Sequence, residues 1–216
     1  MSVQLEQLTR YRAVPTSSWS DALDQLGLPG VCQGLTLRSG HGSIAGTAVT
    51  VKERVGVRGT YGASDFTVVA VLDSVHPGSV LIIEMGGAPV STFGGLAAHA
   101  AVQRGVSGLV IDGGCRDIEE IRTAGLWVSS RHVTPTSGRN RVIIDGINVP
   151  ITVCGVTINP GDYIIGDETG IVAVPPDRVF EALAIAEELT AQDVRFSAAL
   201  DRGETFSAAA SRLQHM

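Results

Sequence analysis

An arginine and two carboxylates stand close together after a pair of glycines. The segment Gly113-Gly114-Cys115-Arg116-Asp117 follows an apolar stretch, and Glu120 lies about one helical turn beyond Asp117. A guanidinium can bind a carboxylate in two places, and a carboxylate can hold a hard divalent cation. Arg116 is therefore a candidate carboxylate clamp and Asp117 a candidate metal ligand, while Glu120 is a candidate for orienting the waters of the metal.

A second glycine-rich segment opens a predicted helix. Gly94, Gly95, Leu96 and Ala97 begin the helix expected at about 95–104, and the glycines leave backbone N–H groups accessible. Free N–H groups at the positive end of a helix favour an anion or a developing oxyanion. If the strands before the two loops are neighbours in a parallel sheet, the loops face each other across a cleft. Metal, carboxylate clamp and oxyanion donors together would stabilise a pyruvate-type enolate.

The same residues also have purely structural explanations. Asp117-Ile-Glu-Glu120 has the spacing of a capping box, with Asp117 as N-cap, and periodicity alone favours this explanation. Arg116 could form a surface ion pair. Gly94 and Gly95 could serve tight packing of a helix on a sheet. The residues by themselves leave these alternatives open.

Alternating helices and strands are expected to position the two loops. Ser18 or Ser20 could cap the first helix and Gly27 could end it. The succession predicts parallel strands joined by right-handed crossovers. The predicted helices are 16–27, 64–73, 95–104 and 117–124, and the predicted strands are 44–52, 80–84, 108–112 and 126–130, with a turn at 113–116.

From about residue 141 the sequence is rich in short predicted strands, at 141–145, 149–153, 156–158, 163–166 and 170–175. A long amphipathic helix at about 177–200 could cover the sheet or pack on a neighbouring subunit. No repeat or linker is visible, so we expect a single α/β domain over residues 1–216.

Composition limits the classes of function. The 216 residues are 44% hydrophobic and 18% charged, as in globular proteins. A net charge of −6 without a basic stripe and an aromatic content of 5% argue against binding of nucleic acid. No apolar run reaches the roughly 20 residues that span a bilayer, and no signal-peptide pattern begins the chain. We expect a cytoplasmic protein with no nucleic-acid or membrane partner.

The remaining reactive side chains are sparse. Cys32, Cys115 and Cys154 form no CxxC pair, so we expect reduced, packed thiols, although Cys115 stands beside the candidate site. The five histidines show no HxH or HExxH spacing, which argues against a metal held by histidines. Lys52 is the only lysine, so an aldolase that works through a Schiff base is not expected.

The stretch from Gly94 to Ile121 resembles the RraA-like family, which includes the class II 4-hydroxy-4-methyl-2-oxoglutarate / 4-carboxy-4-hydroxy-2-oxoadipate aldolases. In part of that family a glycine is followed, after twenty residues, by R-D-x-x-E/D. Here Gly95 is followed, after twenty residues, by Arg116-Asp117-Ile118-Glu119-Glu120. The resemblance extends to the segments 20–27, 44–51, 76–83, 105–117 and 166–175.

The resemblance implies a swivelling β/β/α domain with a parallel βαβαβ core, assembled as a homotrimer or a hexamer with active sites between subunits. It also implies dependence on Mg²⁺ or Mn²⁺. Asp117 would be the direct metal ligand, Arg116 would bind the substrate carboxylate, and the backbone of residues 94–97 would bind the pyruvyl portion. An acidic residue of the neighbouring subunit's C-terminal region would help to hold a water of the metal, with Glu188 and Asp193 as candidates.

The sequence departs from the well-described aldolases at Gly95, where they have an acidic side chain. Glu120 could compensate from the R-D-x-x-E motif, with a different geometry. The departure leaves open which group transfers the proton and which substrate is preferred.

We therefore expect a divalent-metal-dependent lyase that cleaves a small 4-hydroxy-2-oxo acid to pyruvate and also decarboxylates oxaloacetate through the same enolate. The alternative is a non-catalytic regulator that binds and inhibits an RNA-processing nuclease. The Arg116–Asp117 pair and the glycine loop favour the enzyme, because a binding module does not need them. Methyl transfer ranks last, because no glycine-rich strand–helix fingerprint with a downstream acid suits a nucleoside cofactor.

Overall fold

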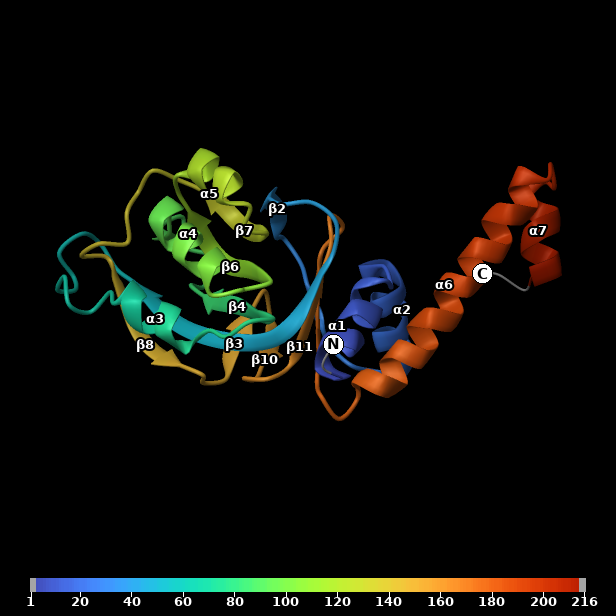
Figure 1. Ribbon diagram of the computed structural model, residues 1–216, viewed down its shortest axis with the longest axis horizontal. Helices are drawn as coiled ribbons and strands as arrows, with labels where there is room; N and C mark the ends of the chain where they lie inside the picture. The colour runs from blue at the N-terminus through green and yellow to red at the C-terminus, as the bar shows by residue number, and fades with distance from the viewer. Residues whose placement is uncertain (1–2, 214–216) are drawn as a thin grey trace.

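The chain folds around a curled sheet, which a computed structural model describes over residues 3–213 (Figure 1). The strands are β1 (Val31–Cys32), β2 (Thr36–Ser39), β3 (Ile44–Val55), β4 (Ser79–Glu84), β5 (Ser91–Phe93), β6 (Gly108–Cys115), β7 (Val128–Val133), β8 (Val142–Ile147), β9 (Ile151–Val153), β10 (Val156–Ile158), β11 (Tyr163–Gly166) and β12 (Ile171–Val174). The helices are α1 (Val3–Arg12), α2 (Thr16–Leu26), α3 (Val68–Ser74), α4 (Gly95–Gln103), α5 (Ile118–Ala124), α6 (Val179–Asp201) and α7 (Phe206–Leu213).

The main sheet has ten strands, in the order β1-β12-β11-β3-β4-β6-β7-β2, with β5 beside β6 and β8 beside β3. The neighbours β3, β4, β6 and β7 run parallel, which confirms the predicted βαβαβ core. Helices α3, α4 and α5 cover one face of these strands, and the β9–β10 hairpin lies over the other (Figure 1). Because both faces are covered, the middle of the sheet is apolar, and Val80–Ile82 of β4 are completely buried.

The glycine pair before the candidate site lies in a strand, so the predicted turn at 113–116 is wrong. Strand β6 continues to Cys115 because β5 pairs with its end, with Ser91 opposite Gly114. A Cβ added at Gly113 would lie 2.4 Å from the sulfur of Met85, and one at Gly114 would lie 2.7 Å from a backbone oxygen. The two glycines therefore permit close packing around the strand, and the chain turns only at Arg116.

Several other boundaries differ from those predicted. Helix α3 begins at Val68 rather than at residue 64, because Gly62 and Asp65 hold a turn before it through a 2.7 Å hydrogen bond. Strands β1, β2 and β5 and helices α1 and α7 were not predicted. Each of the three strands has four residues or fewer, too short for a periodic signal.

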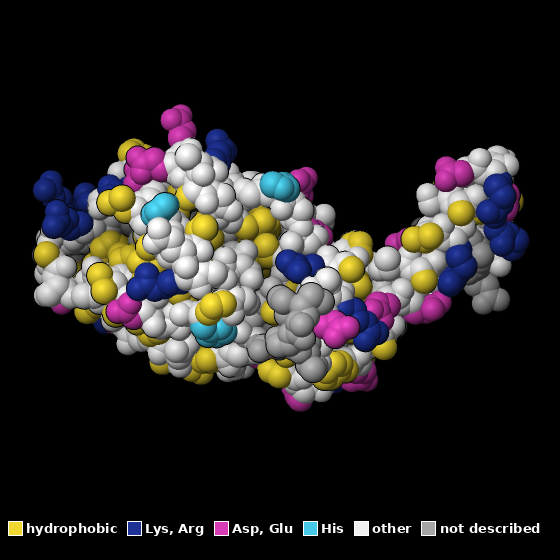
Figure 2. Space-filling view, viewed as in Figure 1, with side chains coloured by type: hydrophobic (Ala, Val, Ile, Leu, Met, Phe, Trp, Pro, Cys, Tyr) yellow, Lys and Arg dark blue, Asp and Glu magenta, His cyan; other side chains and the backbone are white. Residues whose placement is uncertain are grey.

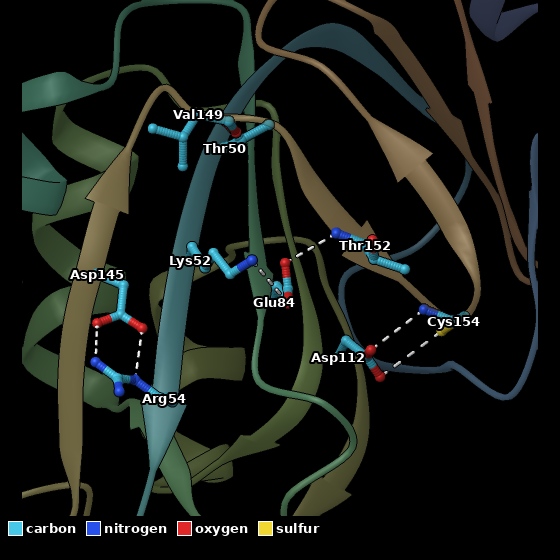
Figure 3. A network of polar contacts seen from close by, with 9 residues as sticks. All are labelled: Thr50, Lys52, Arg54, Glu84, Asp112, Asp145, Val149, Thr152 and Cys154. Atoms are coloured by element: carbon cyan, nitrogen blue, oxygen red, sulfur yellow. Dashed lines mark hydrogen bonds and ion pairs between the residues drawn. The ribbon is translucent and has the colours of Figure 1, made fainter.

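Two acids at the carboxyl ends of the parallel strands point toward the β9–β10 hairpin (Figure 3). Glu84, at the end of β4, accepts a 2.8 Å hydrogen bond from the backbone N–H of Thr152. Asp112, on β6, accepts one of 3.2 Å from the backbone N–H of Cys154. These carboxylates therefore attach the hairpin to one face of the sheet and are turned away from the face that carries α3, α4 and α5.

The two predicted terminal helices are confirmed by α2 and α6. They pack together at one end of the sheet, around a buried cluster that includes Trp19, Leu23 and Leu183. Helix α6 then projects from the body, and α7 folds back against it (Figure 1). No helix within residues 3–213 combines the length and the apolar character needed to cross a membrane.

The hydrogen-bond donors at the N-terminus of α2 find their acceptor in a distant loop. The prediction that Ser18 or Ser20 caps this helix is therefore wrong. Pro15 occupies the N-cap position, and no local side chain caps the helix. Instead, the carboxylate of Asp167 accepts hydrogen bonds of 2.9 Å from the Thr16 N–H and 2.7 Å from the Thr16 hydroxyl. Burial by itself would raise the pKa of Asp167, but the hydrogen bonds, with that from Thr16 foremost, hold it below its usual value.

We predict that Asp167→Ala destabilises the chain and that Ser20→Ala does not. The first variant leaves the N-terminus of α2 and the Thr16 hydroxyl without their acceptor, a loss of about 1–3 kcal/mol. For a chain of this length that lowers Tm by roughly 3–10 °C in a thermal melt. Equal effects of the two substitutions would contradict the assignment of the cap.

Glu53 is a buried carboxyl group in the core between the sheet and the helices. It lies on β3 with 5% of its surface exposed. Its Oε1 accepts a 2.6 Å hydrogen bond from the Thr92 hydroxyl, while Oε2 has no partner among the described side chains. Burial raises the pKa of Glu53 to about 8, against the opposing effect of the Thr92 hydrogen bond. The group is therefore mostly protonated at neutral pH.

We predict that Glu53 makes stability fall as the pH rises from about 4.3, the pKa of an unfolded glutamate, to about 8. In this window the folded chain holds a proton that the unfolded chain releases, which disfavours the fold progressively. Glu53→Gln keeps an acceptor for Thr92 but cannot titrate. Its Tm should exceed that of the parent by roughly 5–10 °C at pH 8 and little at pH 4.5. Thermal melts across this range that give parallel curves would contradict the shift.

Candidate functional site

A cavity of about 640 Å³ opens at the carboxyl ends of β5 and β6. The candidate residues of the two glycine-rich loops all line it, namely Gly94, Gly95, Leu96, Ala97, Arg116, Asp117 and Glu120. The rest of the lining was not predicted and consists of Phe66, Val68, Val69, Leu72, Ser91, Thr92, Phe93 and Ser137. The fold thus brings two loops from different parts of the sequence into one site.

The pairing of β5 with β6 sets the distance between the two loops. The strands run parallel, so α4 and α5 begin side by side at the same edge of the sheet. The Arg116 N–H donates a 3.0 Å hydrogen bond to the carbonyl of Phe93, which continues the contact beyond the strands. The expected facing of the loops is therefore produced by β5, a strand that the sequence did not reveal.

Asp117 stands at the N-cap position of α5 in a left-handed backbone conformation, with φ 54° and ψ 44°. Its side chain makes no capping hydrogen bond, so the capping-box explanation is wrong. Instead, Oδ2 accepts a 3.3 Å hydrogen bond from the Gly95 N–H and lies 3.3 Å from Nε of Arg116. A positive φ is rare outside glycine and is retained mainly where surrounding contacts or function require it. The backbone turns the carboxylate across the helix end and into the cavity.

Gly94 permits this approach of Asp117. A Cβ added at Gly94 would lie 2.5 Å from Oδ2 of Asp117 and 3.2 Å from Nε of Arg116. A side chain at this position would therefore displace the ion pair, so the glycine serves the site in addition to the packing of the helix.

The side chain of Glu120 occupies the space beside Gly95. A Cβ added at Gly95 would lie 2.0 Å from Oε2 of Glu120 and 2.6 Å from its Cβ. The Glu120 carboxylate thus occupies the place where a side chain at residue 95 would start. An acidic group is present at the beginning of α4 although residue 95 has no side chain, because α5 supplies it.

The donor set suits a hard divalent cation that keeps several waters. The side chains of Arg116 and Asp117 are 46% and 36% exposed, so both can reach a ligand. Mg²⁺ is commonly held by one or two carboxylates, with waters and substrate oxygens completing its coordination. Asp117 and Glu120 provide such a pair. Within the described residues no group of three or more His, Cys, Asp or Glu forms a closed metal site.

Other candidate groups lie outside the cavity. Cys115 is buried, and burial raises the pKa of its thiol, which disfavours a reactive thiolate. Cys32 and Cys154 are also free thiols, as expected.

Lys52 lies on the hairpin side of the sheet, 3.7 Å from Glu84 (Figure 3). Of the histidines, His215 falls outside the described residues, and none of the others lines the cavity.

Glu188 and Asp193, the candidates from the C-terminal region, are not brought to this cavity. Both lie on α6, which projects from the end of the molecule that is opposite to α3, α4 and α5 (Figure 1). Glu188 accepts a 2.8 Å hydrogen bond from Arg195, which lowers the pKa of its carboxyl group. These acids could reach such a cavity only in another copy of the chain.

Sequence reasoning missed the apolar wall that α3 and its preceding loop contribute. Val68, Val69 and Leu72 gave only the signal of a short apolar helix, which is typical of core packing. In the structure Val69 is 69% exposed, so its function cannot be to fill the core.

Comparisons with known proteins agree with this architecture. The family model RraA-like, described as Aldolase/RraA, matches residues 16–173. A curated relative from Halalkalibacterium halodurans, named "Putative 4-hydroxy-4-methyl-2-oxoglutarate aldolase", is 29% identical over 191 residues, covering 88% of this chain and 86% of its own. The match covers a smaller share of other curated relatives. It spans 31% of the length of one relative and 59–64% of the length of three more.

Two solved structures share the fold over nearly the whole chain. An uncharacterized protein from Pseudomonas syringae pv. tomato has a TM-score of 0.85 at 28% identity, covering 97% of this chain and 98% of that one. RraAS2 of Streptomyces coelicolor, described as an unusual member of the RNase ES inhibitor RraA protein family, has a TM-score of 0.76 at 25% identity, covering 92% of this chain and 96% of that one. By its sequence, its curled α/β fold and its structural neighbours, the chain belongs to the RraA-like family.

Proposed function

We propose that the chain is a divalent-metal-dependent lyase that cleaves a small 4-hydroxy-2-oxo acid to pyruvate and a second carbonyl compound, and that it also decarboxylates oxaloacetate. One observation carries the proposal. Arg116, Asp117 and Glu120 meet the glycine-bounded start of α4 in one cavity. The relatives named "Putative 4-hydroxy-4-methyl-2-oxoglutarate aldolase" support the same class of reaction.

Substrate binding follows from the charges at this end of the cavity. Arg116 binds the C1 carboxylate through its guanidinium. Backbone N–H groups at the start of α4, other than that of Gly95, which donates to Asp117, face the C2 oxygen. Asp117, with Glu120 nearby, would hold Mg²⁺ or Mn²⁺. When bound, the cation supplies Lewis-acid stabilisation of the negative charge that develops on the 2-oxo group.

Glu120 is the group of this chain placed to move the proton. It accepts the proton of the C4 hydroxyl through a bound water as the C3–C4 bond breaks and C4 becomes a carbonyl carbon. The electron pair of that bond moves into the enolate of pyruvate. A proton returned to C3 then gives the methyl group of pyruvate. In oxaloacetate the same bond change releases CO₂ in place of the carbonyl compound.

We further propose that the active unit is a homotrimer or a hexamer of this chain. Asp117 and Glu120 are the acids that line the cavity, while α6 projects from the far end of the body with Glu188 and Asp193. In such an assembly one of these acids, from a neighbouring copy, would complete the set that holds the waters of the metal.

The second candidate is a non-catalytic regulator that binds an RNA-processing nuclease, suggested by the similarity to RraAS2. The strained Asp117 and the convergent charges favour the enzyme, because inhibition through a surface needs neither. Capture of a nuclease, together with an absence of metal-dependent pyruvate release, would reverse the preference.

We predict that pyruvate release from oxaloacetate and from 4-hydroxy-4-methyl-2-oxoglutarate stops with EDTA and returns with Mg²⁺ or Mn²⁺. Replacing a residue that hydrogen-bonds to a metal ligand typically lowers metal affinity or activity by roughly 10–100-fold. Removing the ligand itself should cost more, so Asp117→Ala should lower kcat/KM by more than about 100-fold. A coupled pyruvate assay measures both effects. Glu119→Gln, an exposed neighbour outside this cavity, serves as the control. Turnover that ignores EDTA, or that Asp117→Ala leaves intact, would refute the proposal.

We predict that the acid of Glu120 can be moved to residue 95. Glu120→Gly should lower kcat by about 10²–10⁴-fold, the usual contribution of a proton-transfer group. The double variant Glu120→Gly with Gly95→Asp should recover part of that loss, because glycine at 120 removes all three side-chain atoms of Glu120 that an added Cβ would meet. Gly95→Asp alone should be as impaired as Glu120→Gly, since the two side chains then compete for one space. A double variant less active than either single variant would contradict the exchange.

A further inference from the structure

The last step of the proposed reaction needs a proton donor near the start of α4. After the C3–C4 bond breaks, the enolate of pyruvate must gain a proton on C3. Hydrophobic side chains gather around α3 and α4 on this face of the molecule (Figure 2), and the cavity lining includes Phe66, Val68 and Leu72. A donor that belongs to the chain must therefore come from the few polar groups of the lining.

Three of the described residues that line the cavity carry a hydroxyl group, namely Ser91, Thr92 and Ser137. The Ser91 hydroxyl donates a 3.1 Å hydrogen bond to a backbone carbonyl. The Ser137 hydroxyl accepts one of 3.2 Å from a backbone N–H. The Thr92 hydroxyl differs, because it lies 2.6 Å from Oε1 of the buried Glu53. Among these three hydroxyls, that of Thr92 is the one connected to an acid.

Thr92 connects the buried acid to the place where the pyruvyl group is proposed to bind. It lies on β5 two residues before Gly94, and the carbonyl of the next residue, Phe93, accepts the hydrogen bond from the Arg116 N–H. Thr92 and Glu53 are 4% and 5% exposed within the single chain. Assembly with other copies of the chain would therefore leave this pair of side chains as it is.

Glu53 holds a proton at neutral pH. Burial raises its pKa to about 8, and Oε2 has no partner among the described side chains, which also disfavours the charged form. A hydroxyl group can donate and accept at the same time. With its proton on Oε1, the acid can donate to the Thr92 oxygen while the Thr92 O–H points to the cavity.

Glu53 has no ionic partner among the described residues. Lys52 and Arg54, its neighbours on β3, are exposed and pair with Glu84 and Asp145 (Figure 3). Burial and the Thr92 hydrogen bond are the causes of its pKa shift. The other charged side chains on the elements and loops around it are exposed or half-buried, namely Asp65, Asp73, Arg116, Asp117, Glu120 and Arg141.

We infer that Glu53, acting through the hydroxyl of Thr92, supplies the proton that C3 of the enolate receives, an inference that rests on the proposed lyase function. The C3–H bond forms as the Thr92 O–H bond breaks, and the Thr92 oxygen takes the proton of Glu53. After pyruvate leaves, water entering the cavity returns a proton to Glu53 along the same path. In the retro-aldol reaction this balances the proton taken from the C4 hydroxyl, whereas decarboxylation of oxaloacetate consumes one proton from solvent.

Exchange of the methyl protons of pyruvate in D₂O with Mg²⁺, followed by ¹H NMR, measures this step in reverse. In that direction Glu53 must accept a proton, so the exchange rate should increase as the pH rises through about 8. Glu53→Gln should lower the rate by about 10²–10⁴-fold, the usual contribution of a proton-transfer group, and should remove this increase. An exchange rate of the parent that falls over this range would contradict the inference.

Variants at the hydroxyl test the connection to the cavity. Thr92→Val should lower exchange as strongly as Glu53→Gln, whereas Thr92→Ser keeps the hydroxyl and should retain most of the rate. Ser137→Ala is the matched control, since it removes a lining hydroxyl that is bound to the backbone and should exchange at the rate of the parent. Undiminished exchange in Thr92→Val would overturn the inference.

A purely structural role of Glu53 predicts a different result. Glutamine at residue 53 keeps an acceptor for Thr92, so a structural role would leave exchange in Glu53→Gln equal to that of the parent, and this outcome would overturn the inference. Loss of exchange together with a Tm at or above that of the parent supports proton transfer, because the variant is then folded and lacks only the acid.

Failure of the proposed function is distinguishable from failure of this inference. If the parent releases pyruvate and Glu53→Gln exchanges the methyl protons as fast as the parent, the lyase proposal stands and the inference is wrong. Release of pyruvate without any methyl exchange in the parent has the same meaning. If the parent neither releases pyruvate nor exchanges its methyl protons, the lyase proposal itself fails.

Discussion

The pairing of β5 with the extended end of β6 is the contact on which the site depends. It places the starts of α4 and α5 next to each other, and glycines at 94 and 95 let side chains of one loop occupy space beside the backbone of the other. With ordinary side chains at these positions the two loops would have to separate. The carboxylates and the helix N–H groups would then no longer share a cavity.

The carboxyl edge of the sheet has two chemically different faces. Strand residues alternate between faces, so Glu84 and Asp112 point to the hairpin and bind its backbone. Beyond the end of β6 the chain turns at Arg116, and the left-handed backbone of Asp117 directs the next carboxylate to the other side. Asp112 and Asp117 lie close in sequence but have different roles. Asp112 binds the hairpin, and Asp117 faces the cavity.

The relation between Gly95 and Glu120 indicates how a site can keep a chemical group while the position in the sequence changes. The space that a side chain on α4 would fill holds a carboxylate from α5. Residue 95 itself carries no acidic side chain, whereas the cavity has a carboxylate at that place.

Local signals in the sequence determined the alternation of strands and helices, the extent of α2 from Thr16 to its glycine cap, and the loops that carry Arg116, Asp117 and Glu120. Periodicity and turn residues act over a few neighbours, so they could be read directly. The tertiary structure alone decided the pairing of β5, the orientation of Asp117, the cap that Asp167 provides for α2 and the protonation of Glu53. Each of these depends on burial or on a partner far along the chain. Such contacts form only in the folded tertiary structure.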